Sequence, residues 1–365
     1  MKRDILVIFG GNSTEHDISV ITAVEALNSM PIKGYNVIPI YIRDSVWYTG
    51  SRLFEIKSYI DFNPKGLNIV CVSGGKVYKA GHYKKFAGFC DADCAVLCTH
   101  GGDGENGSLQ GLLEMNGIPY TSCDVRTSAL CMDKHLTKLA LNAMGVDTVE
   151  GREIVLPHGE GVIDEIESEF GYPVMVKPAE QGSSIGLTFA KNRKALEEGL
   201  TVAAAFGKRA LVEKGLTDFA ELNVAVATLN GKIEVSEVER PISANEFLTY
   251  GDKYMGGGKG MADLKREFPA KIDEKTAKYL KSTAKSVYEH LGLFGVVRMD
   301  FLKKDKVYLN EINTLPGSLA HYLFPKYSYS EFLRGLIESS IMRGAGKKAE
   351  YKTDVLRQLR GAIKK

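Results

Sequence analysis

Four polar side chains near the end of the chain are of the types that bind a metal ion and an anion. They are Arg298, Asp300, Glu311 and Asn313. Two carboxylates and an amide oxygen that converge would repel one another unless a cation lay between them. Oxygen ligands of this kind suit Mg²⁺, which in proteins commonly also binds the phosphate oxygens of a nucleotide. The arginine could hold or polarise a further anion. These residues indicate a magnesium–nucleotide site, with a surface hairpin of similar composition as the alternative.

Two short apolar runs must position these side chains. Residues 296–302 and 307–312 are expected to be strands joined by a turn. Side chains two apart on a strand point to the same face, so each strand presents two of the four polar groups on one side. A turn centred on residues 304–305 places Arg298 opposite Glu311, and all four groups then point the same way.

Composition excludes several functional classes. The 365 residues are enough for two or three packed units. Lys and Arg total 47 and Asp and Glu total 45, with no long run of one sign, so neither a nucleic-acid nor a membrane surface is indicated. No segment reaches the length of a membrane span, and the first apolar run is too short for a signal peptide. The six cysteines form no C-x-x-C pair and are expected to be reduced, which indicates the cytoplasm.

Strand and helix patterns alternate along the chain, which predicts an α/β protein that is α+β when taken as a whole. The first unit, residues 1–125, is expected to be a doubly wound parallel sheet with an inserted hairpin. The second, residues 126–213, contains a strand pair around a glycine–serine loop. The third, residues 214–365, contains a glycine-rich segment, a long packing helix and the strand pair described above.

The glycine–serine loop, residues 182–186, could contact phosphates. It lies between two expected strands and follows Lys177, so its backbone amides, hydroxyls and the nearby lysine could cradle a phosphate group. It is not a P-loop, because no G-x-x-x-x-G-K-[ST] sequence occurs in the chain. A flexible hairpin tip is an equal alternative.

A second glycine-rich loop supports a rival hypothesis. Residues 102–107 match the dinucleotide fingerprint G-x-G-x-x-G, and Asp124 lies about twenty residues further on, as in nicotinamide-dependent oxidoreductases. Two features count against NAD binding. The motif does not follow the first strand, and Asp103 and Glu105 place negative charge where a pyrophosphate would bind.

Taken in order, the motifs of this chain resemble those of the D-alanine–D-alanine ligases of the ATP-grasp superfamily. The matching blocks are FGGNSTEHDIS at 9–19, HGGDGENG at 100–107, QGLLE at 110–114, PYT at 119–121, SA at 128–129, MDK at 132–134, KP at 177–178, GSSIG at 182–186 and EINTLPG at 311–317. The likeness spans most of the chain. It implies an ATP-grasp fold behind an N-terminal doubly wound domain, ATP with two Mg²⁺ ions or Mn²⁺ in their place, and a cytoplasmic homodimer acting on small molecules.

The resemblance also implies a role for each matching residue. Those implied in nucleotide binding are Lys134, Lys177, Glu213, Leu216 and Glu221. The implied metal ligands are Asp300, Glu311 and Asn313. The implied catalytic groups are Glu15, Ser183, Tyr254, Arg298 and the Gly317 backbone. The implied substrate-binding residues are Glu15, His100, Lys253, Arg298, Gly317 and Tyr322.

The implied reaction joins two D-amino acids through an acyl phosphate, for peptidoglycan precursors. D-alanine is the expected second substrate. Tyr322 stands where these ligases usually place a serine that helps to bind the second substrate's carboxylate, which leaves D-serine, D-lactate or another small amino acid open. Asn106 replaces an aspartate, and Gly215 occupies a hinge position often held by a large aromatic residue. A nucleotide-binding protein without turnover is a further hypothesis, which the complete set of metal ligands disfavours.

Overall fold

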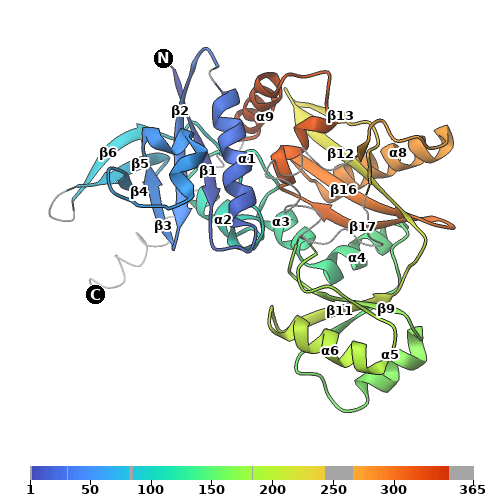
Figure 1. Ribbon diagram of the computed structural model, residues 1–365. Coiled ribbons are helices and arrows are strands. Elements are labelled where there is room, and N and C mark those ends of the chain that lie inside the picture. Colours follow the sequence, from blue (N-terminus) through green and yellow to red (C-terminus); the bar gives the residue numbers. More distant parts are fainter. Residues whose placement is uncertain (1, 31, 82–84, 183, 243–265, 345–365) are drawn as a thin grey trace, which may run out of the picture.

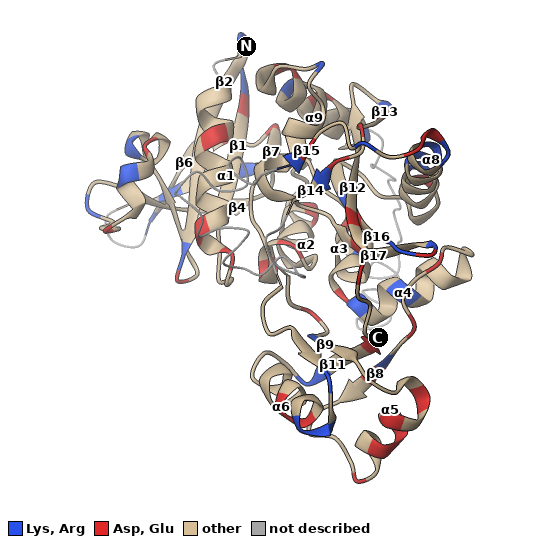
Figure 2. Cartoon of the chain, turned by 45° about the vertical axis from the view of Figure 1, so that its right-hand side comes forward, with Lys and Arg blue, Asp and Glu red and all other residues tan. Residues whose placement is uncertain are grey.

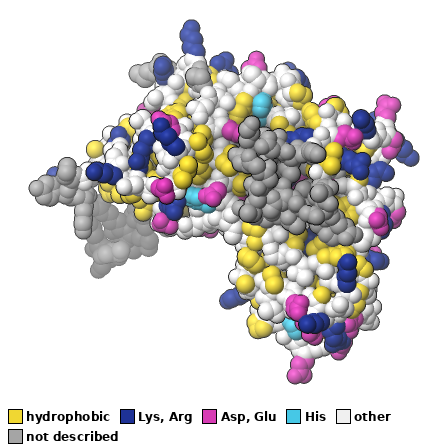
Figure 3. All heavy atoms as spheres, in the orientation of Figure 1, with side chains coloured by type: hydrophobic (Ala, Val, Ile, Leu, Met, Phe, Trp, Pro, Cys, Tyr) yellow, Lys and Arg dark blue, Asp and Glu magenta, His cyan; other side chains and the backbone are white. Residues whose placement is uncertain are grey.

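The computed structural model describes residues 2–30, 32–81, 85–182, 184–242 and 266–344 (Figure 1). Within them, one seven-stranded sheet and two four-stranded sheets follow one another along the chain, and a two-stranded sheet is formed between the second and third strands of the last. The predicted α/β class is confirmed. On the face drawn in Figure 3, positive and negative side chains are mixed, in keeping with the balanced composition.

The first sheet has the strand order β6-β5-β4-β3-β2-β1-β7. Its strands are β1 (Arg3–Gly10), β2 (Tyr35–Arg43), β3 (Val46–Thr49), β4 (Asn68–Ser73), β5 (Lys76–Ala80), β6 (Phe86–Asp91) and β7 (Cys94–Leu97). Only β2, β1 and β7 are parallel; the predicted hairpin insertion adds the other strands antiparallel, so the sheet is mixed. Its helices are α1 (His16–Ser29) and α2 (Ser108–Met115).

The second sheet forms the lobe at the lower right of Figure 1, in the order β10-β9-β11-β8. Its strands are β8 (Gly151–Val155), β9 (Val174–Pro178), β10 (Thr188–Ala190) and β11 (Arg209–Lys214). Helices α5 (Val162–Phe170) and α6 (Arg193–Ala204) pack on it, while α3 (Val125–Met132) and α4 (Lys134–Ala143) link this lobe to the rest. Acidic residues gather on α5 (Figure 2), where Arg193 of α6 pairs with Asp164 and Glu167.

The third sheet has the order β13-β12-β16-β17 and carries the polar hairpin. Its strands are β12 (Ala220–Leu229), β13 (Lys232–Val235), β16 (Val296–Lys303) and β17 (Val307–Asn313), and the two-stranded sheet is β14 (Arg240–Pro241) with β15 (Arg266–Glu267). Helix α8 (Glu274–Leu291) buries Leu280, Ala284 and Val287 in the core beside the sheet, as its spacing predicts. Helix α9 (Tyr329–Gly344) follows.

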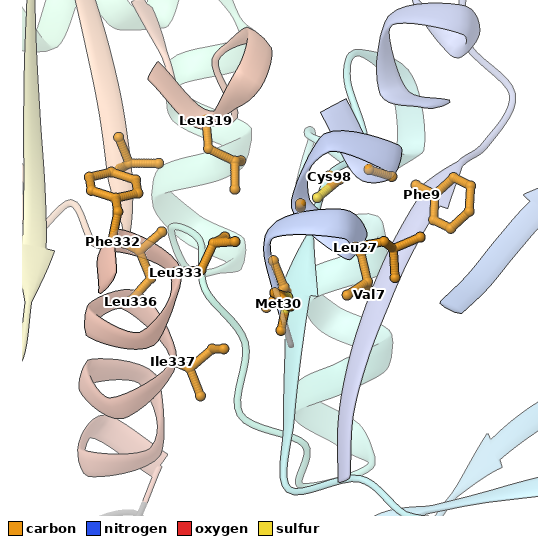
Figure 4. Close-up of a cluster of buried hydrophobic side chains, with 14 of the residues drawn as sticks. Val7, Phe9, Leu27, Met30, Cys98, Leu319, Phe332, Leu333, Leu336 and Ile337 are labelled. Atoms are coloured by element: carbon orange, nitrogen blue, oxygen red, sulfur yellow. The ribbon is translucent and has the colours of Figure 1, made fainter. Parts of the chain in front are cut away.

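One hydrophobic core is shared by the first and third regions (Figure 4). Val7, Leu27 and Met30 come from the first region, and Leu333 and Ile337 come from α9. Each is buried, and full burial of such a side chain contributes about 1.5–3 kcal/mol. This shared core fixes the end of the first sheet beside the loop that follows β17.

The predicted register of the polar hairpin is wrong by two residues. Arg298 lies opposite Asn313, and Asp300 lies opposite Glu311, because the register shifts after Asp300 and leaves Asn310 as an extra, unpaired residue. Such a bulge turns the bulged residue out of the regular alternation. The total slip is even, so the four polar groups still share one face, as predicted.

Candidate active site

Two adjoining cavities lie between the sheets. The first encloses about 1020 Å³ and the second about 800 Å³, counting the open space at their mouths. Both are lined by Lys134, Gln181, Glu221 and Glu311, so they share a wall. We call the cavity of about 1020 Å³ the substrate end and the cavity of about 800 Å³ the nucleotide end, after the predicted roles of the residues that line each.

At the nucleotide end, two lysines share one buried carboxylate. Lys138 Nζ lies 2.5 Å from Glu213 Oε1, and Lys177 Nζ pairs with the other oxygen of Glu213. Burial would raise the pKa of Glu213, but Lys177 and Lys138 together hold it below its usual value. Lys177 also donates to Asn310 Oδ1 at 3.0 Å, so the bulge in β17 gives this lysine a partner. The cluster retains more positive than negative charge, which suits a phosphate group.

The rest of this end combines a cation with an apolar wall. Burial lowers the pKa of the Lys134 ammonium, which donates to the backbone oxygen of Gln181. Leu216 and Phe219 line the cavity near Glu221. The other apolar lining residues are Val149, Met175, Leu187 and Leu302. Such a wall can hold the flat face of a base.

Gly215, one of the departures from the ligase pattern, is required by packing. A Cβ at this position would lie 2.6 Å from the carbonyl oxygen of Pro173 and 2.9 Å from the Phe189 ring. No larger side chain fits without moving the backbone. Phe219, a few residues further on, supplies an aromatic side chain to the same cavity.

The polar hairpin lies where the two cavities meet. Arg298 binds Asp300 through two hydrogen bonds of 2.7 Å, from Nε to Oδ1 and from Nη2 to Oδ2. Burial would lower the pKa of Arg298, but the Asp300 carboxylate raises it well above its usual value, so the charge is retained. Asn313 Nδ2 also donates to Asp300, at 3.0 Å. Arg298, Glu311 and Asn313 line the substrate end, and Asp300 lies behind them, 2 % exposed.

The donors of this hairpin fit a hard divalent cation. Asp300, Glu311 and Asn313 carry carboxylate and amide oxygens, the ligand types that Mg²⁺ prefers, on one face of two paired strands, and Asp300 would have to exchange contacts with Arg298 or Asn313 to bind an ion. Among the described residues, no three His, Cys, Asp or Glu side chains form a metal-binding group by themselves. An ion here would therefore use the amide oxygen and ligand oxygens as well as the two carboxylates.

His100 is neutral and ties two loops together. Its Nδ1 lies 2.6 Å from the carbonyl oxygen of Leu315, which can only accept, so Nδ1 carries the proton. Its Nε2 lies 2.9 Å from Thr22 Oγ1, which accepts from the Ser318 backbone N–H at 3.1 Å and therefore donates to the ring. Burial lowers the pKa of His100 to about 4. With both nitrogens bound to protein, His100 positions the loop that carries Gly317.

A carboxylate reinforces this connection. Glu105 accepts from the Gly101 and Leu315 backbone N–H groups at 3.0 and 3.1 Å and from the Thr314 hydroxyl at 3.2 Å. Burial, with Glu15 nearby, raises the pKa of Glu105 to about 7. In the sequence, Glu105 belongs to a matching block and argues against NAD, but it is assigned no role in the site.

Glu15 is placed between two glycine loops. It is 8 % exposed, and its Oε2 would lie within 2.8 Å of a Cβ added to either Gly101 or Gly182. Glycine at both positions lets the backbone approach the carboxylate. Glu15, His100 and Gly317 line the same end of the cavity, so the structure brings these three predicted residues together.

The loop after Gly317 adopts a strained conformation. Ser318, Leu319 and Ala320 have φ of 49°, 48° and 47°, in the left-handed region that costs roughly 1–2 kcal/mol per residue. Helix α1 holds this turn through Thr22 and through Glu25, which accepts from Ser318 Oγ at 2.7 Å. The turn directs the Gly317 end of the loop into the cavity.

The remaining predicted site residues are placed differently. Tyr322 lies beside the substrate end but does not line it; it lines a separate surface hollow with Glu25 and Tyr329. Ser183, Lys253 and Tyr254 lie outside the described residues.

The dinucleotide fingerprint has a structural explanation. Asp124 accepts from the Thr127 N–H at 2.9 Å and caps α3, while Glu105 binds the Gly101 N–H of its own loop and the loop that follows β17. Neither carboxylate faces a nucleotide. Asn106 Oδ1 accepts from the Ser108 N–H at 3.0 Å at the start of α2, a contact that an aspartate could make equally well, so nothing in this contact explains the amide.

Several residues at the site were not predicted. They are Thr22, Lys138, Gln181, Asn223, Glu239 and Arg266. Lys138 follows Lys134 by one helical turn, so the helix period could have indicated it. Arg266 and Glu239 carry no such local signal.

Comparisons with known proteins agree with the fold and the site. The structure of the D-alanine–D-alanine ligase from Coxiella burnetii is 23 % identical, with a TM-score of 0.80, and covers 100 % of this chain and 99 % of its own; these ligases have the ATP-grasp fold, which is therefore the fold of this chain. The family models for the N-terminus and the C-terminus of D-Ala–D-Ala ligases match residues 4–123 and 138–334.

Two further relatives bear on the identity of the family. The D-alanine–D-alanine ligase of Thermosipho melanesiensis is 38 % identical over 354 residues, covering 94 % of this chain and 95 % of its own. The VanG D-Ala:D-Ser ligase of Enterococcus faecalis is 28 % identical with a TM-score of 0.79, covering 93 % of this chain and 100 % of its own. The chain belongs to the D-alanine–D-alanine ligase family.

Proposed function

We propose that this enzyme joins two D-alanine molecules in an ATP- and Mg²⁺-dependent reaction that supplies peptidoglycan precursors. One observation carries the proposal: a cavity with a lysine cluster and an apolar wall adjoins a second cavity that is lined by Glu15, His100, Arg298 and Gly317. A nucleotide in the first would present its terminal phosphate to a small acid in the second.

Each end of the cavity has a defined part in this proposal. Lys134 and Lys177 hold the phosphates of ATP, Glu213 and Leu216 contact adenine, and Glu221 binds the ribose. These groups line the nucleotide end. Asp300, Glu311 and Asn313 would hold two Mg²⁺ ions, which when bound would neutralise phosphate charge.

The first chemical step turns a poor electrophile into a reactive one. A carboxylate oxygen of the first D-alanine attacks the γ-phosphorus, the bond to ADP breaks, and an acyl phosphate forms. Two anions about 4 Å apart repel by roughly 4 kcal/mol at an effective dielectric near 20, so fixed positive charge must offset their approach. Arg298 supplies that charge as phosphate transfers, and the Gly317 backbone N–H assists.

The second step forms the amide bond. The amine of the second amino acid attacks the acyl carbon, phosphate leaves, and the amine gives up a proton. Glu15 receives the ammonium group of the first substrate. Ser183 and Tyr254 would link with Glu15 to close the site and keep water from the acyl phosphate, and Lys253 would face the second carboxylate.

A different second substrate is the other candidate. The second substrate could instead be D-serine, D-lactate or another small amino acid. Two observations favour this alternative: Tyr322 stands at the sequence position of the usual serine, and the chain is similar to a D-Ala:D-Ser ligase. The contrasting hypotheses of an NAD-dependent oxidoreductase and of binding without turnover have no support from the family.

We further propose a cytoplasmic homodimer whose structural units are residues 1–125, 126–213 and 214–365. Among the described residues, no helix is long and apolar enough to cross a membrane.

A coupled assay of ADP release with a panel of D- and L-amino acids tests the proposal. D-alanine should stimulate release most strongly, and D-alanyl-D-alanine should be the product. If no amino acid stimulates release, the ligase activity is refuted. Dominant D-serine incorporation would favour the other second substrate.

A further inference from the structure

An arginine with no part in the implied roles lies in the wall of the substrate end. Arg266 belongs to the two-residue strand β15, where it pairs with Pro241 of β14. Arg266, Pro241 and Glu239 all line the same cavity as Arg298 and Gly317. Among the described residues, the cationic side chains that line this cavity are Lys134, Arg266 and Arg298.

Two contacts with described residues help to fix the plane of the Arg266 guanidinium. Its Nη1 lies 3.2 Å from Oε1 of Glu239, whose side chain is 4 % exposed. Its central carbon lies 4.3 Å from the centroid of the Tyr322 ring, a cation–π arrangement. Glu239 is itself held, since Asn223 Nδ2 donates to its other oxygen at 3.2 Å. The Arg266 side chain is 18 % exposed, so it reaches the cavity with little freedom.

Tyr322 acts in this arrangement through its ring. It does not line the cavity, and its hydroxyl is buried without a hydrogen-bond partner in the described part of the chain. A hydroxyl in this position does not take over the part of the usual serine in binding the carboxylate of the second substrate. The ring instead contacts the Arg266 guanidinium without lining the cavity.

We propose that Arg266 binds the carboxylate of the second amino acid and that Tyr322 is the positioning residue that holds it. The inference rests on the proposed ligase function and names the group that recognises its second substrate. The attacking amine must lie next to the acyl phosphate, and so beside Arg298. In an α-amino acid one carbon separates amine and carboxylate, so the carboxylate must meet a donor a few ångströms further along the same wall.

The chemistry of arginine suits that task. A guanidinium presents several N–H donors in one plane and stays charged at every physiological pH, so it can bind a carboxylate while its ion pair with Glu239 is retained. Selection would therefore act on the α-carboxylate of the second substrate. An acceptor without it, such as D-alaninamide, would bind poorly.

The test is the Arg266→Met variant of the full-length enzyme, with Arg240→Met as its matched control. Arg240 lies on the neighbouring strand β14, and its side chain is exposed and outside the cavity wall. D-alanine saturation of ADP release gives separate Michaelis constants for the two amino acids. Arg266→Met should raise the second constant about 10- to 100-fold, as expected for hydrogen bonds to a charged group, and leave those for ATP and the first D-alanine near wild type.

Two further measurements sharpen the result. The preference for D-alanine over D-alaninamide as acceptor should fall by a similar factor in Arg266→Met. Tyr322→Leu should raise the second Michaelis constant more than Tyr322→Phe, which keeps the ring. If Arg266→Met does not fold, Arg266→Lys keeps the charge without the planar group and should show a smaller rise in the same constant.

The outcomes separate the inference from the function it rests on. A wild-type enzyme that releases no ADP with any amino acid refutes the ligase function itself. An active wild type whose Arg266 variants change the ATP or first-substrate constant, or leave the second constant unaltered, refutes the role of Arg266 alone.

Discussion

The two ends of the cavity are held together by different kinds of contact. At the nucleotide end, Lys138 and Lys177 share the carboxylate of Glu213, so ion pairs between side chains hold this end together. At the substrate end, His100 and Glu105 bind backbone groups and fix the course of a loop. A cluster of charged side chains attracts phosphate groups without requiring one exact position. Hydrogen bonds to the backbone, by contrast, fix the position of a loop and therefore of the reacting group beside it.

The largest expected effect comes from breaking the charge cluster. Lys138→Met leaves the buried Glu213 with Lys177 alone, and loss of one partner of a buried ion pair typically costs about 3–5 kcal/mol. Urea denaturation should show a loss of that size in the free energy of unfolding. Lys194→Met is the control, because Lys194 pairs with Glu198 only at the surface. Equal losses in the two variants would mean that the buried cluster is not structural.

Next in size is the loss of the charge at the junction of the two ends. Arg298→Ala should lower kcat by about 100- to 1000-fold, because its charge acts mainly as phosphate transfers. Calorimetry should show an ATP affinity close to that of wild type. Arg240→Ala serves as the exposed control. Weak ATP binding with normal turnover would assign Arg298 to the nucleotide instead.

The neutral state of His100 predicts a pH dependence of stability. Its pKa is lowered to about 4 in the folded enzyme, from about 6.5 when unfolded, so unfolding takes up a proton between these values. His100 therefore has no effect on the pH dependence of the free energy of unfolding above pH 6.5, and it lowers that free energy by roughly 3 kcal/mol as pH falls to about 4. Denaturant unfolding of His100→Asn and of the exposed control His158→Gln, at pH 7.5 and 4.5, measures it. Only His100→Asn should lose part of the pH dependence.

The smallest effect is expected from the link between α1 and the Gly317 loop. Thr22→Val keeps the shape of the side chain but leaves the Ser318 N–H and His100 Nε2 without their partner, which should cost about 1–3 kcal/mol. The loop should lose its position, so kcat should fall while the Michaelis constant for ATP stays near wild type. Thr22→Ser keeps the hydroxyl and should restore kcat. A rise in the ATP constant instead would abolish the distinction between the two ends.

Local periodicity was a reliable guide to the elements around the site. The hairpin strands, helix α8 and the parallel core of the first sheet follow from alternation and helical spacing. Side chains alternate along a strand, and the predicted register was wrong by two residues, an even number. The four polar residues of the hairpin therefore still lie on one face, as predicted. The bulge at Asn310 was missed, because one extra residue leaves no mark on so short a pattern. An inserted hairpin was predicted, but not that strands β3 to β6 extend the first sheet. The reason is related: turn signals show that strands reverse, but not that they join an existing sheet.

Sequence alone determined which chemistry this protein could perform, because the ordered motifs fix the reactive groups and their spacing along the chain. Tertiary structure alone decided how those groups are supported. Arg266 meets Tyr322, and Lys138 meets Glu213, across long stretches of chain with no local pattern to relate them. Such pairs form only when sheets and helices pack, since tertiary packing, not sequence proximity, brings their side chains together.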